Sequence, residues 1–375
     1  MAGLYIHIPF CKKRCHYCDF YSTANLAEKN ELLQSILLEM EKRKDFFEGE
    51  SINTLYFGGG TPSLLQPEEI SLLLSKAKAL FPINSGAEIT LEANPDDLSI
   101  EYIRGIRSAG INRLSIGIQS FHDEDLKLLN RRHSASQAVD CVNDAFNEGF
   151  GNLTIDLIYG LPGMSRESWT DNIRQVLELP VVHLSAYHLS IEEGTAFHHM
   201  LKKNTIREAT ETESLEQFGI LIDMMNDAGF EQYEISNFAR EKKFSRHNSA
   251  YWNDTKYLGL GPSAHSYNRA SRQWNVRDVK QYIQYINSDE YWYEGEVLNE
   301  KDKMNEFIMV SLRTMQGLDL SRFTELFDPE SGARLKQHIK TFVPGEIIEP
   351  KAGVYCFTRK GIMISDYVIE KLFFE

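Results

Sequence analysis

The sequence predicts an α/β protein: a parallel sheet that curves into a barrel or part of one, followed by a small helical module. Three observations lead to this prediction. Apolar, β-branched runs alternate six times with amphipathic helical stretches in the first half of the chain. Consecutive β-α units of this kind pair as parallel strands covered by helices. The alternation stops near residue 195, and 375 residues leave room for a barrel and an appendage. A doubly wound open sheet is the alternative that periodicity leaves open.

The predicted strands are short apolar runs of the kind that parallel sheets bury. They lie near residues 4–8, 54–57, 88–93, 113–118, 153–159 and 181–188. Helices are expected between them, over residues 27–44, 67–80, 134–150 and 166–179. Pro67 followed by two glutamates is a typical helix start.

The second half of the chain predicts further helices around an aromatic-rich segment. The helices are expected at residues 208–229, 276–287 and 301–315. Residues 233–267 are expected to be irregular. From Asp319 onward, short helices and a β-hairpin predict a small helical module with a wing.

Composition argues against several classes of protein. Asp and Glu number 54 against 40 Lys and Arg, a net charge of −14, and nucleic-acid binding needs a basic surface instead. No secretory signal and no run of 18 apolar residues is found. The five cysteines are odd in number and three are clustered, which is typical of metal binding in a reducing compartment. We therefore expect a cytoplasmic protein.

Cys11, Cys15 and Cys18 form a C-x3-C-x2-C pattern directly after the first predicted strand. Three thiolates on one short loop can hold three irons of a [4Fe–4S] cluster and leave the fourth iron open to a small molecule. Structural thiols, or half of a zinc site, are the alternatives. A zinc site would need a second pair of Cys or His at finger spacing, and the sequence has none.

Polar and glycine residues follow the other predicted strands. The carboxyl ends of parallel strands meet at one rim of a barrel, so these residues should gather beside the cysteines. Glycines at positions 58–60 allow close approach of the backbone to a ligand. Glu92, Gln119 and Asp156 could hold amino and ribose hydroxyl groups, and Arg131 could pair with a carboxylate. The set fits a nucleoside that carries an amino acid.

These segments resemble the radical S-adenosylmethionine (SAM) superfamily, and within it the branch of oxygen-independent coproporphyrinogen oxidases and HemW heme chaperones. The matching segments, between residues 5 and 163, are YIHIPFCKKRCHYCDFYS, LYFGGGTPSLL, ITLEANPDDL, RLSIGIQSFHDEDLKLLNRRH and TIDLIYGLPG. The resemblance implies a partial (β/α)6 barrel of the TIM type, with the cluster on Cys11, Cys15 and Cys18. It implies that reduction of the cluster cleaves bound SAM. The implied SAM contacts are Tyr5, Tyr17, Gly59, Gly60, Thr61, Glu92, Gln119, Arg131 and Asp156.

Two departures from the decarboxylating oxidases favour the HemW side of this branch. The oxidases carry a further Cys where this sequence has Phe20, and they have a longer N-terminal extension. The run RHNSAYW at residues 246–252 is similar to the HNxxYW motif of the HemW group, whose histidine, here His247, is a heme ligand. A loop histidine bonded to the backbone is the other interpretation of His247.

The resemblance thus implies a protein that binds heme and passes it to an acceptor. The implied partners are heme, SAM, an electron donor and an acceptor protein; a membrane-associated acceptor, and so a peripheral membrane location, stays open. Oxidation of coproporphyrinogen III, or another radical-SAM modification, is the alternative, so enzyme activity is left open. The predicted domains are a radical SAM partial barrel at residues 1–195, a barrel-capping and heme-binding region at 196–299, and a winged-helix-like domain at 300–375.

Overall fold

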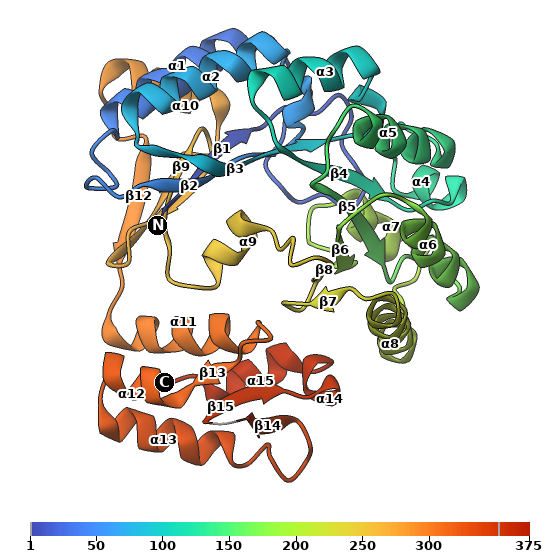
Figure 1. Ribbon diagram of the computed structural model, residues 1–375, viewed down its shortest axis with the longest axis vertical. Coiled ribbons are helices and arrows are strands. Elements are labelled where there is room, and N and C mark those ends of the chain that lie inside the picture. The colour runs from blue at the N-terminus through green and yellow to red at the C-terminus, as the bar shows by residue number, and fades with distance from the viewer. Residues whose placement is uncertain (1, 352) are drawn as a thin grey trace.

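A curved, largely parallel sheet forms the core of the protein, and helices cover its outer face (Figure 1). The computed structural model describes residues 2–351 and 353–375. Six parallel strands follow one another in sequence order, as predicted. They are β1 (Ala2–Ile8), β2 (Ile52–Gly59), β3 (Ile83–Ala93), β4 (Arg113–Gln119), β5 (Leu153–Tyr159) and β6 (His183–His188). The predicted barrel-type α/β fold is confirmed.

The helices between these strands include all four that were predicted. They are α1 (Lys29–Lys42), α2 (Pro67–Leu80), α3 (Ile100–Ala109), α4 (Asp123–Leu128), α5 (Ala135–Asn147) and α6 (Arg166–Glu178). The sequence prediction omitted α3, although its ends carry ordinary signals. The Ser99 hydroxyl accepts a hydrogen bond from the amide of Tyr102, and Gly110 ends the helix with φ +114°.

Alternate residues of the parallel strands have different surroundings. Leu4, Ile6 and Ile8 of β1 are completely buried in the hydrophobic core. The polar alternates on neighbouring strands, such as Tyr56 and Ser115, instead line the interior of the barrel. The period of two in each strand therefore separates an apolar layer under the helices from a polar lumen.

The second half of the chain extends the sheet at both edges. β8 (Asn237–Ala239) pairs antiparallel with β6, and β7 (Glu231–Gln232) pairs with β8. β9 (Lys256–Leu260) pairs parallel with β1 and is followed by antiparallel strands. Those strands are β10 (His265–Tyr267), β11 (Ser271–Asn275) and β12 (Tyr293–Val297). The helices of this region are α7 (Ala196–Lys202), α8 (Glu211–Asp227), α9 (Arg246–Tyr251) and α10 (Val279–Ser288).

The expectation that residues 233–267 are irregular is wrong. This segment contains β8, α9, β9 and β10. Each of these elements has six residues or fewer, and such short runs carry little periodicity of their own. Pairing of β9 with β1 and of β8 with β6, which the sequence pattern does not encode, fixes these two strands in the sheet. Residues 196–299 are thus continuous with the barrel sheet.

A small module follows, beginning with α11 (Glu300–Leu312). The predicted short helices and hairpin are present; the hairpin pairs β14 (Ile348–Lys351) with β15 (Val354–Phe357). The other elements are β13 (Leu318–Asp319), α12 (Leu320–Leu326), α13 (Pro329–Ile339), α14 (Arg359–Ile362) and α15 (Ser365–Leu372). An ion pair between Arg359 and Asp223 joins the module to α8.

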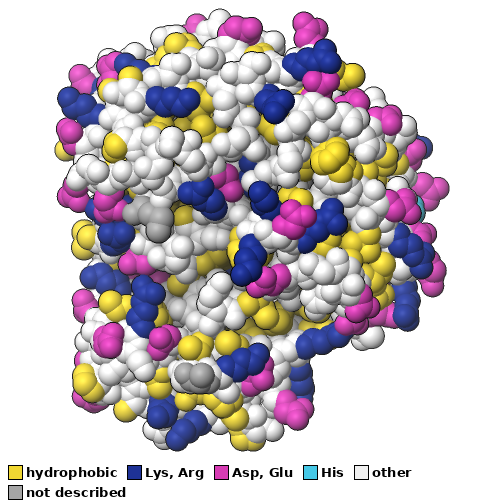
Figure 2. All heavy atoms as spheres, viewed as in Figure 1, with side chains coloured by type: hydrophobic (Ala, Val, Ile, Leu, Met, Phe, Trp, Pro, Cys, Tyr) yellow, Lys and Arg dark blue, Asp and Glu magenta, His cyan; other side chains and the backbone are white. Residues whose placement is uncertain are grey.

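Two surface properties bear on partners. Figure 2 shows basic and acidic side chains interspersed over the drawn face, so that face has no extended field of one sign. Among the described residues, the helices are too short or too polar for any of them to span a bilayer.

Candidate functional site

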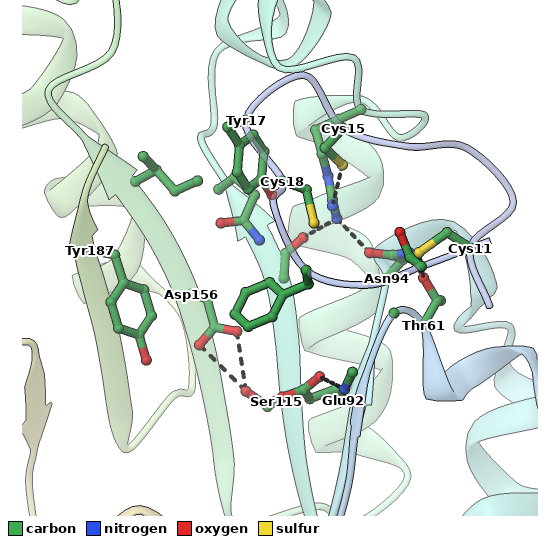
Figure 3. A pocket seen from close by; sticks show the side chains of 18 of the residues that line it. Cys11, Cys15, Tyr17, Cys18, Thr61, Glu92, Asn94, Ser115, Asp156 and Tyr187 are labelled. Carbon is green, nitrogen blue, oxygen red and sulfur yellow. Dashed lines mark hydrogen bonds between the residues drawn. The ribbon is translucent and has the colours of Figure 1, made fainter. Parts of the chain in front are cut away.

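A cavity of about 520 Å³ opens at the carboxyl ends of the parallel strands (Figure 3). All three clustered cysteines line it. Eight of the nine residues expected around SAM line it as well: Tyr17, Gly59, Gly60, Thr61, Glu92, Gln119, Arg131 and Asp156. The ninth, Tyr5, does not reach the cavity and donates or accepts a hydrogen bond at His7 Nδ1 (3.1 Å).

The cysteine loop is closed at its base by a short pairing of its two ends. The Cys11 amide donates to the Thr23 carbonyl (3.0 Å), and the Thr23 amide donates to the Pro9 carbonyl (2.8 Å). Phe10, wholly buried, anchors the start of the loop in the core. The residues between these anchors can therefore present their sulfurs to the cavity without regular structure.

The surroundings of the thiols suit a cluster. A Cβ at Gly60 would lie 3.0 Å from Cys11 Sγ and 2.7 Å from the Phe10 carbonyl oxygen, so only glycine leaves this space free. Arg131 donates to Cys15 Sγ (3.4 Å) and the Thr61 hydroxyl to Cys11 Sγ (3.5 Å). The described residues contain no group of three His, Cys, Asp or Glu arranged to hold a single metal ion. A [4Fe–4S] cluster on three cysteines needs a different arrangement, with one thiolate on each of three irons.

Two buried carboxyl groups face the middle of the cavity. Glu92 accepts hydrogen bonds from the Tyr56 hydroxyl (2.8 Å) and the Gly59 amide (3.1 Å), and burial raises its pKa to about 7. Asp156 accepts from the Ser115 hydroxyl (3.2 Å), and burial raises its pKa to about 6. A cationic amino group would favour the ionised form of either carboxyl, and ribose hydroxyls could donate to both.

Arg131 and Gln119 are held in position by the end of β4. The Arg131 guanidinium donates to the Asn94 side-chain oxygen (2.6 Å) and the Gly117 carbonyl (2.5 Å). Its buried Nε has no hydrogen-bond partner among the described residues. Gln119 has φ +72°, where the register of β4 against β5 shifts. Such bulges re-aim side chains next to binding sites, and nothing in the sequence indicates this one.

Sequence reasoning missed several residues that line the deeper part of the cavity. They are hydroxyl, guanidinium and amide side chains from the strands and from the start of α9: Arg113, Ser115, Thr154, Ser185, Ser245 and Asn248. The strand members occupy alternate, inward-facing positions. The period of two within the strands is therefore the signal that could have identified them.

His247 does not line this cavity and lies behind its inner end, toward the amino-terminal ends of the strands. It packs beside Gly3 and Thr54, near the amino-terminal ends of β1 and β2, and is only 2% exposed. Figure 1 shows α9, which carries it, on the concave side of the sheet between the barrel and the C-terminal module. The interpretation as a loop histidine bonded to the backbone is wrong, because both ring nitrogens face side chains, those of Thr54 and Tyr251.

Comparison with known proteins gives consistent results along the chain. The Radical SAM superfamily profile matches residues 5–176, and the HemN C-terminal domain profile matches residues 298–364. The heme chaperone HemW of Bacillus subtilis is 32% identical over 372 residues, 98% of each chain. That of Haemophilus influenzae is 33% identical over 379 residues, 98% of this chain and 97% of the relative.

One solved structure covers nearly the whole chain. Coproporphyrinogen III oxidase (HemN) from Escherichia coli, described as a radical SAM enzyme, superposes with a TM-score of 0.85 at 25% identity. The match covers 99% of this chain and 89% of that one. Both the fold and the full-length identity therefore agree with the resemblance seen in the motifs. The chain belongs to the HemW family within the radical SAM superfamily.

Proposed function

We propose that this protein is a heme chaperone: it binds heme and passes it to an acceptor protein. The observation that carries the proposal is the full-length likeness to proteins named heme chaperone HemW, which extends over barrel and C-terminal module alike. His247 is the proposed axial ligand. Burial lowers its pKa to about 3, so the imidazole is neutral at physiological pH and keeps a lone pair for iron.

The rim cavity has a separate role in the proposal. Cys11, Cys15 and Cys18 would hold a [4Fe–4S] cluster, which would supply the electron for SAM cleavage. Glu92 and Asp156 orient the amino and ribose groups of SAM, and Arg131 faces its carboxylate. The other proposed SAM contacts are Tyr17, Gly59, Gly60, Thr61 and Gln119. Tyr5 does not line the cavity and packs behind the residues that do.

Ferric heme titration of anaerobically reconstituted protein tests the chaperone function. The wild type should bind one heme with a histidine-ligand absorption spectrum, and His247→Ala should change that spectrum. Transfer is then followed to a heme-free acceptor such as apomyoglobin, separated by size after mixing. Heme binding that is weak, unsaturable and insensitive to His247→Ala would refute the proposal.

Coproporphyrinogen oxidation is the second candidate, and the likeness to the E. coli oxidase at 25% identity supports it. The same reconstituted protein is incubated with SAM, a strong reductant and coproporphyrinogen III. Protoporphyrinogen formed over many turnovers would establish the oxidase. Deoxyadenosine without a porphyrin product would indicate SAM cleavage directed to another substrate.

A further inference from the structure

The ring of His247 is fixed before any heme arrives. It stacks on the ring of Tyr56, with centroids 4.9 Å apart and planes at 25°, and on that of Tyr5 at 6.3 Å and 26°. A Cβ at Gly3 would come within 3.4 Å of His247 Cε1, so the β1 backbone closes against the ring edge. An imidazole held in this way can rotate very little.

The two ring nitrogens have partners of different acidity. Nδ1 lies 2.8 Å from the Thr54 hydroxyl oxygen, and Nε2 lies 3.0 Å from the Tyr251 hydroxyl oxygen. A phenol is a stronger hydrogen-bond donor than an aliphatic alcohol, because its ring withdraws electron density from the oxygen. We therefore assign the proton to Nδ1, which donates to Thr54, while Nε2 accepts from Tyr251. This is the tautomer in which a metal-binding histidine offers Nε2 and anchors its other nitrogen.

Tyr251 lies one helical turn after His247 on α9, at the outer side of the pair. Tyr251 is 37% exposed as a residue, whereas His247 is almost completely covered. The ring of Tyr251 meets that of Tyr257 edge-on at 4.8 Å, and its hydroxyl is directed inward, onto Nε2. Tyr251 thus separates the proposed ligand atom from solvent and has an open side toward which to move.

We propose that Tyr251 is a removable cap on His247: its hydroxyl occupies Nε2 in the heme-free protein, and heme iron takes that place when Tyr251 turns outward. This inference rests on the proposed function. The exchange is balanced, because one O–H···N hydrogen bond breaks and one Fe–N bond forms. Tyr251 keeps its proton, the Nδ1–H of His247 continues to donate to Thr54, and no proton is released.

If Tyr251 is a cap, a variant with a less polar residue at position 251 should bind heme more tightly than the wild type. Tyr251→Phe keeps the ring but removes the hydrogen bond that competes with iron, so heme affinity should rise about fivefold. Tyr251→Ala also removes the ring and should raise the heme association rate further. Tyr257→Phe is the matched control, since Tyr257 contacts the Tyr251 ring without bonding to His247, and its affinity should stay within about twofold of wild type.

Ferric heme titrations of the reconstituted full chain, followed in the Soret region, and stopped-flow association rates measure these effects. Tighter, faster binding by Tyr251→Phe with an unchanged ligand spectrum supports the cap. Unchanged or weaker heme binding by Tyr251→Phe overturns it. A phenolate-to-iron charge-transfer band that is present in the wild type and lost in Tyr251→Phe also overturns it, because Tyr251 itself would then be the ligand. Wild-type and His247→Ala titrations report separately on the proposed function: if the wild type binds no heme, that function fails, whatever Tyr251→Phe does.

Discussion

The two ends of the barrel differ in how they treat their polar groups. At the carboxyl rim, thiols, carboxyl groups and the Arg131 side chain line an open cavity. At the amino-terminal base, His247 is buried and both its nitrogens are bonded. A ligand at the rim would therefore meet an existing cavity, whereas a ligand at His247 would first have to displace a hydrogen-bond partner. The ligand of an open site can be inferred from the polar groups that line it. At a closed site, only the group that a ligand would displace can be identified.

Tyr56 contacts both ends. The hydroxyl of Tyr56 donates to Glu92 at the rim (2.8 Å), and its ring stacks on His247 at the base. One aromatic layer thus separates the proposed SAM site from the proposed heme site. If the ends are functionally separate, a change at one should leave binding at the other intact, and the predictions below test this.

The largest expected effect is at the cluster. Cys11→Ser replaces a thiolate that a three-cysteine cluster cannot lose, so iron and sulfide should fall to background after reconstitution. Heme titration of the same variant should still give the wild-type histidine-ligand spectrum, because His247 is at the other end of the barrel. Iron analysis and absorption spectra measure both results. Parallel loss of heme binding would show that the ends do not act separately.

A smaller loss is expected for the carboxyl groups of the cavity. Asp156→Ala removes a buried acceptor proposed for ribose hydroxyls, and hydrogen bonds to a charged group contribute about 1.5–3 kcal/mol. SAM affinity should therefore fall about 10- to 100-fold in equilibrium dialysis with cluster-loaded protein. Asp125→Ala, at a partly buried carboxyl on α4 bonded to Ser120, is the matched control and should bind SAM normally. Equal losses in both variants would point to general destabilisation.

SAM binding should also depend on pH. Burial raises the pKa of Glu92 to about 7 and that of Asp156 to about 6, so both carboxyls are mostly protonated at pH 5.5. The ammonium group of SAM favours their ionised forms, and affinity should therefore rise about tenfold between pH 6 and 8. Glu92→Gln should flatten the upper part of that rise. A wild-type affinity that is constant over this range would exclude the carboxyls as partners of the ammonium group.

Much of the rim could be predicted from sequence because its residues follow strands in order. Parallel strands deliver their carboxyl ends to one edge, so Glu92, Gln119 and Asp156 could be grouped from spacing alone. The base could not be predicted, because His247 meets Thr54 across 193 positions, through pairing of short strands whose partners the sequence does not reveal. Local sequence patterns predict where a loop follows a strand. They do not predict which distant helix packs against the opposite end of the barrel.

The smallest expected effect is at Phe20, the most exposed of the large hydrophobic side chains that line the cavity. Phe20 is 67% exposed and lines the edge of the cavity. If heme bound at the rim instead of at His247, Phe20 is the side chain that a porphyrin would contact there. Phe20→Ala should change the free energy of unfolding by less than about 0.5 kcal/mol, since little of its area is buried. Heme affinity should be unchanged as well, because the proposed heme site lies on the far side of Tyr56. Denaturant unfolding and Soret titration measure the two quantities, with Tyr251→Ala as the variant at the base that should respond. A marked loss of heme affinity in Phe20→Ala would move heme to the rim, beside the cysteines, and reverse the assignment of the two ends.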